Sequence, residues 1–543
     1  MSEETNNVVV EETAATETAP VEPKAKTKFG KKLDGYFGIT KAGSSIRTEI
    51  VAGIITFLAM CYILTVNPNQ FFFGGSIGAD GPTFVPTTHP LWSSVFMATA
   101  FGAIIGTLLM AFLARLPLAQ ASGMGLNSMV GSIIGGGVGF FSYKFEFTIA
   151  NAMFMVLISG MIFFLLSVVS IKGRSLRQMI FDGIPTAIKK AIPVGIGLFI
   201  AYIGMQNCGL IIGNEYTQVS LIDFSSWVPQ LVKNGMKVTP APALVCLFGL
   251  VAIAVLSHLK VKGAVIFGIL AATLLGIPLG VTDLGVVAGQ EAGITWEFWT
   301  NFSNYFAGEN GVFGLVFTEG WKLPAGCAFT VIMLIITMSM IDMFDTMGTC
   351  VGCCSAAGLM DENGTPINYN KIMWADSIAT CTGAIVGTST VTTFVESGAG
   401  IAAGGKTGLT ALVTAIMFLL SIFLLPVFAM IPSAAAASAL LYVGVLMMTG
   451  VKNIDFSDIR TSIPAFIAIA IMPLAYSITK GIGMAILSYV VIAAICYVID
   501  IIKYACVKGK KADAVAPKWE ISVVTLIIAA LFVVYFFVPV VLA

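Results

Sequence analysis

The chain is poor in charged residues and in histidine, and both shortages narrow its class. Only 11% of its 543 residues are Asp, Glu, Lys or Arg, whereas a soluble globular protein carries about 25%. Hydrophobic residues make up 57%, and the mean hydropathy is +0.93. The two histidines, His89 and His258, disfavour a histidine-ligated metal site or a histidine-based catalytic centre. The sequence therefore predicts a polytopic membrane protein that uses no metal and no cofactor.

The chain also lacks the features of a secreted, disulfide-bonded protein. No basic segment leads into an early apolar core with a cleavage site, so no signal peptide is predicted. The ten cysteines are scattered through apolar segments without a paired framework. Residues 1–23 are polar and contain no aromatic residue, which predicts a disordered cytoplasmic tail. Residues 24–48 are basic and partly aromatic, and we expect them to lie on the inner membrane surface.

Apolar stretches of the length of a membrane span recur along the chain. A transmembrane helix needs about 20 mostly apolar residues. Fourteen such segments are predicted near 49–67, 92–114, 120–141, 147–171, 183–206, 241–259, 263–280, 325–347, 371–388, 391–405, 408–431, 433–450, 461–479 and 483–505. A fifteenth apolar stretch, 519–541, closes the chain, and the sequence leaves open whether it crosses the membrane. Lys and Arg concentrate in alternate loops, Arg177 among them, which places those loops and the N-terminus in the cytoplasm.

Two glycine-rich segments differ from ordinary spans and match each other. "ASGMGLN" at 121–127 aligns with "ESGAGIA" at 396–402. They fall seven spans apart, so the two halves of the chain would have opposite orientations, as in an inverted repeat. The residues before each segment favour a short strand, and the second helix would then begin near Ser397, as an N-cap. Such a broken span suits a polar or anionic ligand; tight packing of a Gly/Ala face is the alternative, but it leaves Glu396 unexplained.

Few charged side chains fall within the spans, and each is costly there, at roughly +2.5 to +3.5 kcal/mol. Asp342 and Asp345 are three residues apart on the eighth span, Asp376 is on the ninth, Glu396 begins the tenth, and Asn127 lies in the third. Carboxylates that share one cavity repel, so one of them is expected to hold a proton near neutrality, as proton coupling requires. Asp345 as an interfacial charge and Asp376 as a structural hydrogen-bonder are equally open interpretations.

Five motifs between residues 45 and 505 are shared with a known family. They are "RTEIVAGIITFLAMCYILTVNP", "ASGMGLN", "IDMFDTMGT", "ADSIATCTGAIVGTSTVTTFVESGAGIAAGGKTGLTALVT" and "IPAFIAIAIMPLAYSIT". In them the chain resembles the nucleobase–cation symporters (nucleobase–ascorbate transporter-like), in the branch of azaguanine and hypoxanthine/guanine permeases. The resemblance implies an all-α membrane fold of fourteen spans, built as a 7+7 inverted repeat with two half-helices preceded by short strands.

The same resemblance implies a division into domains. A core domain would combine 49–171 with 325–431, and a gate domain would combine 183–280 with 433–505. An outer loop, 281–324, and a basic loop with an extra apolar C-terminal segment, 506–543, would complete the chain.

The function implied by the resemblance is proton-coupled import of hypoxanthine, guanine or adenine by an elevator movement, in the cytoplasmic membrane and as a homodimer. Glu396 and Asp342 would bind the base, and Asp342, Asp345, Asp376 and Glu396 would serve proton coupling or support the site. Asn127 matches an asparagine important to this branch. The remaining substrate-binding candidates are backbone N–H groups and ring-packing side chains: Gly123, Met124, Ser397, Gly398 and Phe394. For Phe394 and Met124, plain packing is equally open.

Other functions remain open at this stage. A transporter of uracil, xanthine or an inorganic anion on the same fold would need different site chemistry, and an anion carrier would favour a basic residue over four acids. Sodium coupling in place of proton coupling is also open. An integral membrane enzyme would need a nucleophile with a base, or a metal cluster, and none is visible. A channel is a further option, and no nucleic acid partner is expected.

Overall fold

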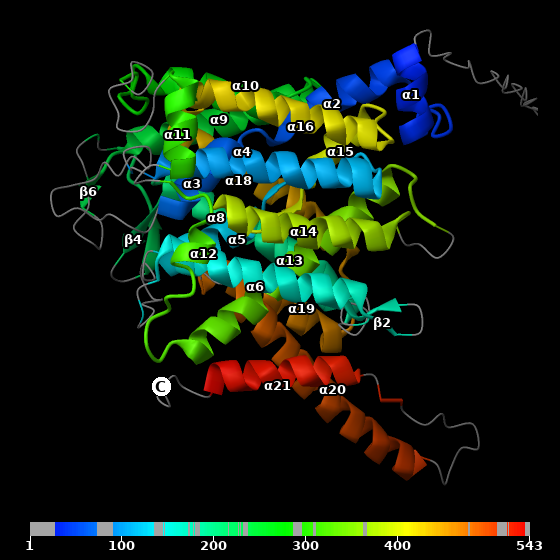
Figure 1. Cartoon of the computed structure of the whole chain (residues 1–543). Coiled ribbons are helices and arrows are strands. Elements are labelled where there is room, and N and C mark those ends of the chain that lie inside the picture. The colour runs from blue at the N-terminus through cyan, green and yellow to red at the C-terminus, as the bar shows by residue number, and fades with distance from the viewer. Residues whose placement is uncertain are drawn as a thin grey trace, which may run out of the picture.

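Long apolar helices of the computed structural model lie side by side along one common direction (Figure 1). The structure describes residues 28–72, 89, 91–134, 145, 147–171, 174–177, 179, 185–214, 217–225, 227, 230–231, 237–285, 296–307, 311–361, 366–475, 478–507, 518–519 and 521–537. The predicted tail, 1–23, lies outside these residues, as do parts of 24–48, 281–324 and 506–543.

The helices follow the predicted apolar stretches closely. The first half of the chain contains α1 (Lys28–Phe37), α2 (Ile46–Met60), α3 (Ile63–Phe72), α4 (Trp92–Leu109), the π-helix η2 (Met110–Ala114), α5 (Met124–Ile134), α6 (Ile149–Val168), α8 (Thr186–Asn207), α9 (Pro240–His258) and α10 (Ala264–Gly276). The second half contains α11 (Phe298–Ala307), α12 (Leu315–Thr318), α13 (Ala328–Ala356), α14 (Tyr369–Val386), α15 (Ser397–Ala402), α16 (Gly408–Ser421), η3 (Ile422–Leu424), α17 (Leu425–Ala429), α18 (Ser433–Met448), η4 (Thr449–Asn453), α19 (Ile459–Leu474), α20 (Ile478–Val507) and α21 (Val523–Phe537).

Within the described residues, nine helical segments are long and apolar enough to cross a membrane. Three shorter apolar helices accompany them, from α10, α19 and α21. The molecule is therefore a mostly helical, multi-pass membrane protein, as its composition predicted.

Among the residues that the structure describes, four short antiparallel strand pairs interrupt the helices. Three are local hairpins: β2 (Ser170–Ile171) with β3 (Arg174–Ser175), β4 (Ile211–Asn214) with β5 (Gln218–Leu221), and β6 (Gln230–Leu231) with β7 (Lys237–Val238). The hairpins that begin with β4 and β6 lie at one end of the bundle, whereas α1 and β2 lie at the other (Figure 1). Segments predicted on opposite sides of the membrane thus gather at opposite ends of the bundle.

The fourth strand pair joins the two halves of the chain. β1 (Gln120–Ser122) pairs with β8 (Val391–Thr393), and Ala121 stands opposite Thr392. α5 begins directly after β1, and α15 begins shortly after β8. Both predicted strand-to-helix breaks are therefore present.

A short strand inside a membrane needs partners for its outer edge. Thr107 of α4 supplies them, because its hydroxyl donates to the Gln120 carbonyl and accepts from the Gln120 N–H, each at 3.0 Å. α4 approaches so closely because it carries Gly106, where an added Cβ would lie 2.6 Å from a methyl group of Val391. Small residues on α4 thus fix the strand pair at the middle of the protein.

Peripheral helices cover parts of the bundle. Aromatic residues of α11 pack on Phe101 of α4, and the hydroxyl of Tyr305 donates to the Val386 carbonyl at 2.7 Å. The final helix, α21, packs along α20, where a side chain at Gly483 would collide with Phe532. The stretch whose path the sequence left open is thus a helix attached to the bundle.

Candidate functional site

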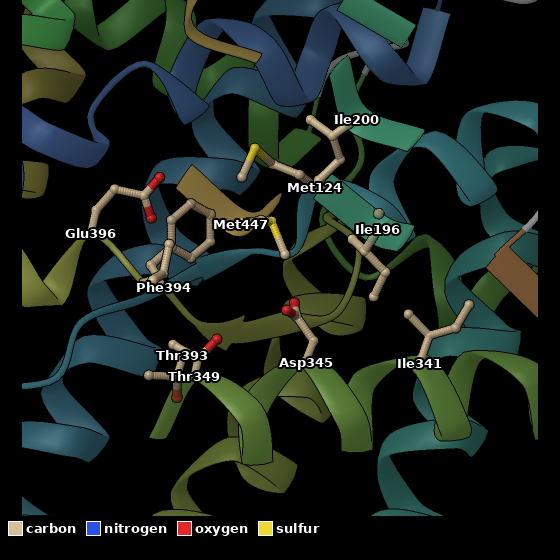
Figure 2. A pocket seen from close by; sticks show the side chains of 12 residues that line it. Met124, Ile196, Ile200, Ile341, Asp345, Thr349, Thr393, Phe394, Glu396 and Met447 are labelled. Carbon is tan, nitrogen blue, oxygen red and sulfur yellow. The ribbon is translucent and has the colours of Figure 1, made fainter. Parts of the chain in front are cut away.

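A pocket of about 440 Å³, including the space that opens to solvent, lies where the starts of α5 and α15 meet α13 (Figure 2). α8 and α18 form its opposite wall. The lining residues are Met124, Gly125, Ile196, Ile200, Ile341, Asp345, Thr349, Thr393, Phe394, Val395, Glu396 and Met447. Both broken spans therefore contribute to one cavity, although they lie far apart in the sequence.

The pocket combines two carboxylates with apolar walls. Asp345 comes from α13 and Glu396 from the turn before α15, and both side chains reach the cavity (Figure 2). Ile196, Ile200 and Met447 face them from α8 and α18. Small-molecule sites have this character, with apolar lining and a few placed polar groups. The arrangement suits a flat, mostly apolar ligand that carries hydrogen-bond donors on its edge.

Glu396 is held by a tyrosine from the first span. The hydroxyl of Tyr62 lies 2.5 Å from Oε1 of Glu396. The second carboxylate oxygen, Oε2, is buried and has no hydrogen-bond partner among the described residues. Glu396 was predicted from the sequence, whereas Tyr62, which belongs to the "AMCYILTVNP" part of a shared motif, was not. Its place opposite Glu396 depends on a contact between the first and tenth spans that no local pattern encodes.

The two aspartates of α13 have different surroundings. Ile341, Asp345 and Thr349 are spaced four residues apart, share one helix face and line the pocket. Asp342 does not line the pocket, is fully buried, and accepts a hydrogen bond of 3.1 Å from Thr380 of α14. Asp345 therefore lines the pocket in place of Asp342, and the expected contact of Asp342 with a ligand stays a prediction.

Asp376 lies behind the strand pair as a hydrogen-bond acceptor for three elements. Its oxygens accept from Arg177 at 3.0 Å, from Thr346 of α13 at 2.7 Å and from Gln120 of β1 at 3.2 Å. The structural role that was one of two interpretations for Asp376 thus agrees with its contacts.

Arg177 does not have the exposed side chain that is expected of a loop arginine. The positive-inside pattern placed it in a cytoplasmic loop, but its side chain has no exposed surface. Its guanidinium lies 4.1 Å from the centroid of the Phe163 ring, an arrangement that favours a cation–π contact. A charge count cannot distinguish a loop arginine from one that turns inward to a buried aspartate.

Asn127 lies in a buried polar network beside the pocket. Its side-chain oxygen accepts from Ser389, and its amide group donates to the Ser122 carbonyl at 3.4 Å. Ser122 also hydrogen-bonds Thr388 at 2.6 Å, and Thr388 accepts from Asn67 of α3 at 2.9 Å. Asn127 therefore does not line the pocket but connects α5 to the residues before β8.

Three predicted backbone donors are already paired within the protein. The N–H of Gly123 donates to the Thr390 carbonyl at 2.9 Å, that of Ser397 to Phe394 at 3.1 Å, and that of Gly398 to Val395 at 2.9 Å. These three N–H groups are therefore already hydrogen-bonded in this structure, and their binding of ring acceptors stays a prediction.

The predicted cap at Ser397 is also corrected. Glu396 is the N-cap of α15 and makes no side-chain capping bond. The Ser397 hydroxyl instead accepts from the Ala119 N–H at 3.0 Å. It thereby joins α15 to the segment that leads into β1.

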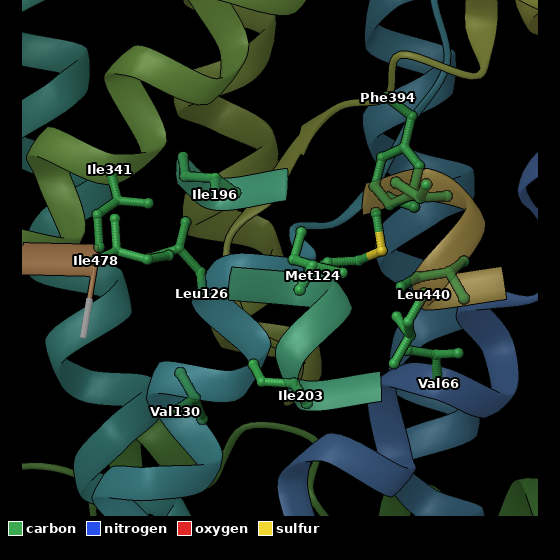
Figure 3. Close-up of a cluster of buried hydrophobic side chains, with 14 of the residues drawn as sticks. Val66, Met124, Leu126, Val130, Ile196, Ile203, Ile341, Phe394, Leu440 and Ile478 are labelled. Atoms are coloured by element: carbon green, nitrogen blue, oxygen red, sulfur yellow. The ribbon is translucent and has the colours of Figure 1, made fainter. Parts of the chain in front are cut away.

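Met124 and Phe394 line the pocket and also belong to the hydrophobic core. Both are at least nine-tenths buried, and they cluster with apolar side chains from α3, α8 and α18 (Figure 3). Substrate contact and plain packing are therefore compatible for these two residues, because packing fixes the side chains whose edges form the pocket wall.

Glu49 is a buried acid that sequence analysis assigned to a span end. Its carboxylate accepts from the backbone N–H groups of Lys406 and Thr407 and from the Thr410 hydroxyl, at 3.0, 3.2 and 2.6 Å. It holds the two residues that precede α16, whose N-cap is Thr407, and ties the end of the α15 segment to α2. Among the described residues, no three His, Cys, Asp or Glu side chains gather as metal ligands would.

Comparison with known proteins places this geometry in a family. The model of the permease family, Xan_ur_permease, matches residues 47–484. The chain belongs to this family, the nucleobase–ascorbate transporters. This permease is 35% identical to the guanine/hypoxanthine permease PbuO of Bacillus subtilis, over 84% of this chain and 94% of that one. It is 33% identical to the adenine permease AdeP of Escherichia coli, over 84% and 90%.

A solved structure shares the fold of the permease. The transmembrane domain of the cyanobacterial bicarbonate transporter BicA superposes with a TM-score of 0.54 at 15% identity, covering 80% of this chain and 97% of that domain. At this identity the likeness establishes the fold and not the substrate.

Proposed function

We propose that this permease imports purine nucleobases together with protons. The observation that carries the proposal is the pairing of Asp345 with Glu396 in a pocket that is otherwise mostly apolar. A purine ring is flat, presents apolar faces, and carries N–H donors on its edge. Relatives named as guanine/hypoxanthine and adenine permeases support the same substrate class.

The hydrogen-bond pattern favours a base over an inorganic anion. Oε2 of Glu396 has no partner among the described residues, so it is available to accept an N–H of the base. Asp345 offers a second acceptor across the pocket. The Thr392 hydroxyl donates to one of its carboxylate oxygens over a long contact of 3.4 Å. An anion would face both carboxylates with no compensating cation among the residues that line the pocket, and would be repelled. The fold shared with a bicarbonate transporter therefore does not imply a shared substrate.

The position of the pocket supports an elevator mechanism. α5, α13 and α15 would belong to a core domain, whereas α8 and α18 would belong to a gate domain, within fourteen spans arranged as a 7+7 inverted repeat. The gate side contributes only apolar side chains, Ile196, Ile200 and Met447. A loaded core can slide past such a wall without breaking hydrogen bonds to it. The permease would work as a homodimer in the cytoplasmic membrane, with its N-terminus inside.

Proton coupling follows from the charge that the core must carry. Asp342, Asp345 and Glu396 all lie at or beside the pocket, and moving their charges past an apolar wall is unfavourable. One of these acids would take a proton from outside before the base binds. The neutralised, loaded core would then move and release both inside. Sodium coupling is the alternative, in which a sodium ion in place of the proton would neutralise the acid before the core moves.

Uptake by proteoliposomes tests the proposal. Labelled hypoxanthine should accumulate under an inward proton gradient, lose accumulation when an uncoupler is added, and be displaced by guanine or adenine but not by bicarbonate. Glu396→Gln should lower uptake at least 100-fold while keeping the thermal stability of the wild type. Glu319→Gln, at an exposed site, is the matched control.

Two results would contradict the proposal. A wild type that accumulates no purine would refute the substrate class, and a Glu396→Gln variant that transports every purine at the wild-type rate would refute the site. Accumulation driven by sodium and insensitive to the uncoupler would replace the proton with sodium.

A further inference from the structure

Tyr62 occupies the short break between α2 and α3 within the first span. Its backbone carbonyl accepts from the N–H of Val66 at 3.0 Å, so it forms the first turn of α3. Its side chain is 1% exposed and is absent from the residues that line the pocket. Any effect of Tyr62 on a ligand in this pocket must therefore pass through a neighbouring side chain.

That neighbour is Glu396. A hydroxyl has one proton to donate, and two acceptors lie within reach of the Tyr62 hydroxyl: Oε1 of Glu396 at 2.5 Å and the sulfur of Met124 at 3.6 Å. A carboxylate oxygen is by far the stronger acceptor, and hydrogen bonds to ionised acceptors are short. The proton of Tyr62 therefore lies on Oε1, which leaves Oε2 as the free acceptor of a pocket-lining carboxylate.

We propose that Tyr62 sets the base selectivity of the permease by occupying Oε1 of Glu396, so that Oε2 is the one fully free acceptor of this carboxylate. The proposal rests on the proposed function, since it concerns how a purine is recognised in the same pocket. Guanine presents two adjacent donors, the N1–H and the 2-amino group, which match both oxygens of a free carboxylate. Hypoxanthine presents only the N1–H on that edge. A carboxylate whose Oε1 already accepts from Tyr62 satisfies the single N–H of hypoxanthine with Oε2, but it offers the 2-amino group of guanine only an oxygen that is already hydrogen-bonded and therefore accepts more weakly.

Removing the Tyr62 hydroxyl should shift the preference of the pocket toward guanine. In Tyr62→Phe the ring still fills its space, but Oε1 loses its donor and a buried acceptor is left unpaired. Guanine can pair both oxygens, whereas hypoxanthine leaves one of them unsatisfied. Sites that leave a buried polar group unpaired discriminate strongly against the ligand that fails to pair it. The ratio of the dissociation constants of hypoxanthine and guanine should therefore rise roughly tenfold or more in favour of guanine.

Equilibrium binding of both bases to the purified, full-length permease tests the inference. The wild type should bind hypoxanthine and guanine within roughly threefold of each other, since the Glu396 oxygen that already accepts from Tyr62 adds little binding energy for guanine. Tyr62→Phe should shift their ratio, with transport of guanine retained. Tyr305→Phe is the matched control, because Tyr305 is another fully buried tyrosine, whose hydroxyl donates to the Val386 carbonyl away from the pocket. It should lower the thermal stability and leave the ratio unchanged.

The outcomes separate the inference from the proposed function. Equal loss of affinity for both bases in Tyr62→Phe would show a purely structural tyrosine and overturn the inference. A wild type that already prefers guanine more than tenfold, or that binds adenine and neither oxopurine, would overturn it without any variant. Either result leaves purine transport standing, whereas a wild type that binds no purine overturns the proposed function itself.

Discussion

Arg177 and Asp376 form an ion pair of 3.0 Å in which neither side chain has any exposed surface. Asp376 also holds Thr346 of α13 and Gln120 of β1. The pair thus connects the segment that follows α6 to the helix and the strand on which the pocket is built. Because both charges are out of contact with water, each depends on the other for compensation.

Breaking this pair from one side should be strongly destabilising. Arg177→Met leaves a buried carboxylate without its cation, which costs about 3–5 kcal/mol. Asp376→Leu should cost a similar amount, and the double variant should lose less than the sum of the two. Thermal unfolding of the detergent-solubilised protein measures all three. Glu319→Ala breaks an ion pair whose side chains are more than half exposed, and it should change stability by less than about 1 kcal/mol. Additive effects of the two buried substitutions would contradict the assignment.

Substitution of the two α13 aspartates should separate ligand binding from support of the site. Asp345 lines the pocket, whereas Asp342 is buried against Thr380. Asp345→Asn should weaken equilibrium binding of hypoxanthine by at least roughly tenfold, because a ligand acceptor is replaced. Asp342→Asn should change binding by less than roughly threefold and alter the proton dependence of uptake instead. A larger loss of affinity in Asp342→Asn than in Asp345→Asn would show that the pocket is not the binding site.

The glycines of α15 should differ sharply in their tolerance of a methyl group. A Cβ at Gly400 would lie 2.0 Å from the Thr56 hydroxyl and 2.7 Å from the Ala52 carbonyl, whereas a Cβ at Gly398 meets nothing within 4 Å. Gly400→Ala should therefore cost about 1–3 kcal/mol of stability through overpacking against α2. Gly398→Ala should stay within about 0.5 kcal/mol of the wild type. Thermal unfolding of the two variants measures this difference in stability. Equal stabilities would contradict the close packing of α15 on α2.

Glu49 should matter for the start of α16. Glu49→Gln turns one acceptor oxygen into an amide group that cannot accept from a backbone N–H, which costs about 1–3 kcal/mol. Thr410→Val removes only the hydroxyl contact of 2.6 Å and should cost less. Hydrogen exchange of the Lys406 and Thr407 amides should quicken in Glu49→Gln. Unchanged exchange at both positions would show that the carboxylate does not hold these two amides.

The sequence indicated a feature of the fold or the site wherever a residue type is energetically unfavourable inside a membrane span. Glu396 was identifiable because a carboxylate beside glycines in an apolar segment has few structural explanations. The strands before α5 and α15 were identifiable from β-compatible residues that interrupt apolar spans. Nearly every long helix followed from the length of an apolar run.

What the sequence did not reveal are relations across the bundle. The choice between Asp342 and Asp345 depends on the rotation of α13 about its axis, and both residues have the same local pattern. Arg177 looked like a loop residue because charge counting ignores where a side chain turns. Tyr62 looked like an ordinary apolar residue of the first span. Each of these roles is set by a residue that lies more than a hundred positions away in the sequence or on another helix.

The pairing of β1 with β8 constrains how this protein can be made. β1 enters the membrane early in synthesis, but its partner follows only after most of the chain has been translated. Until Val391–Thr393 arrive, the backbone of Gln120–Ser122 has no strand to pair with, and unpaired backbone groups are not tolerated in lipid. The third span must therefore wait in a sheltered environment, such as the insertion machinery, or enter the bundle late. A nascent chain that stops short of α15 would carry most of its helices and still have no pocket.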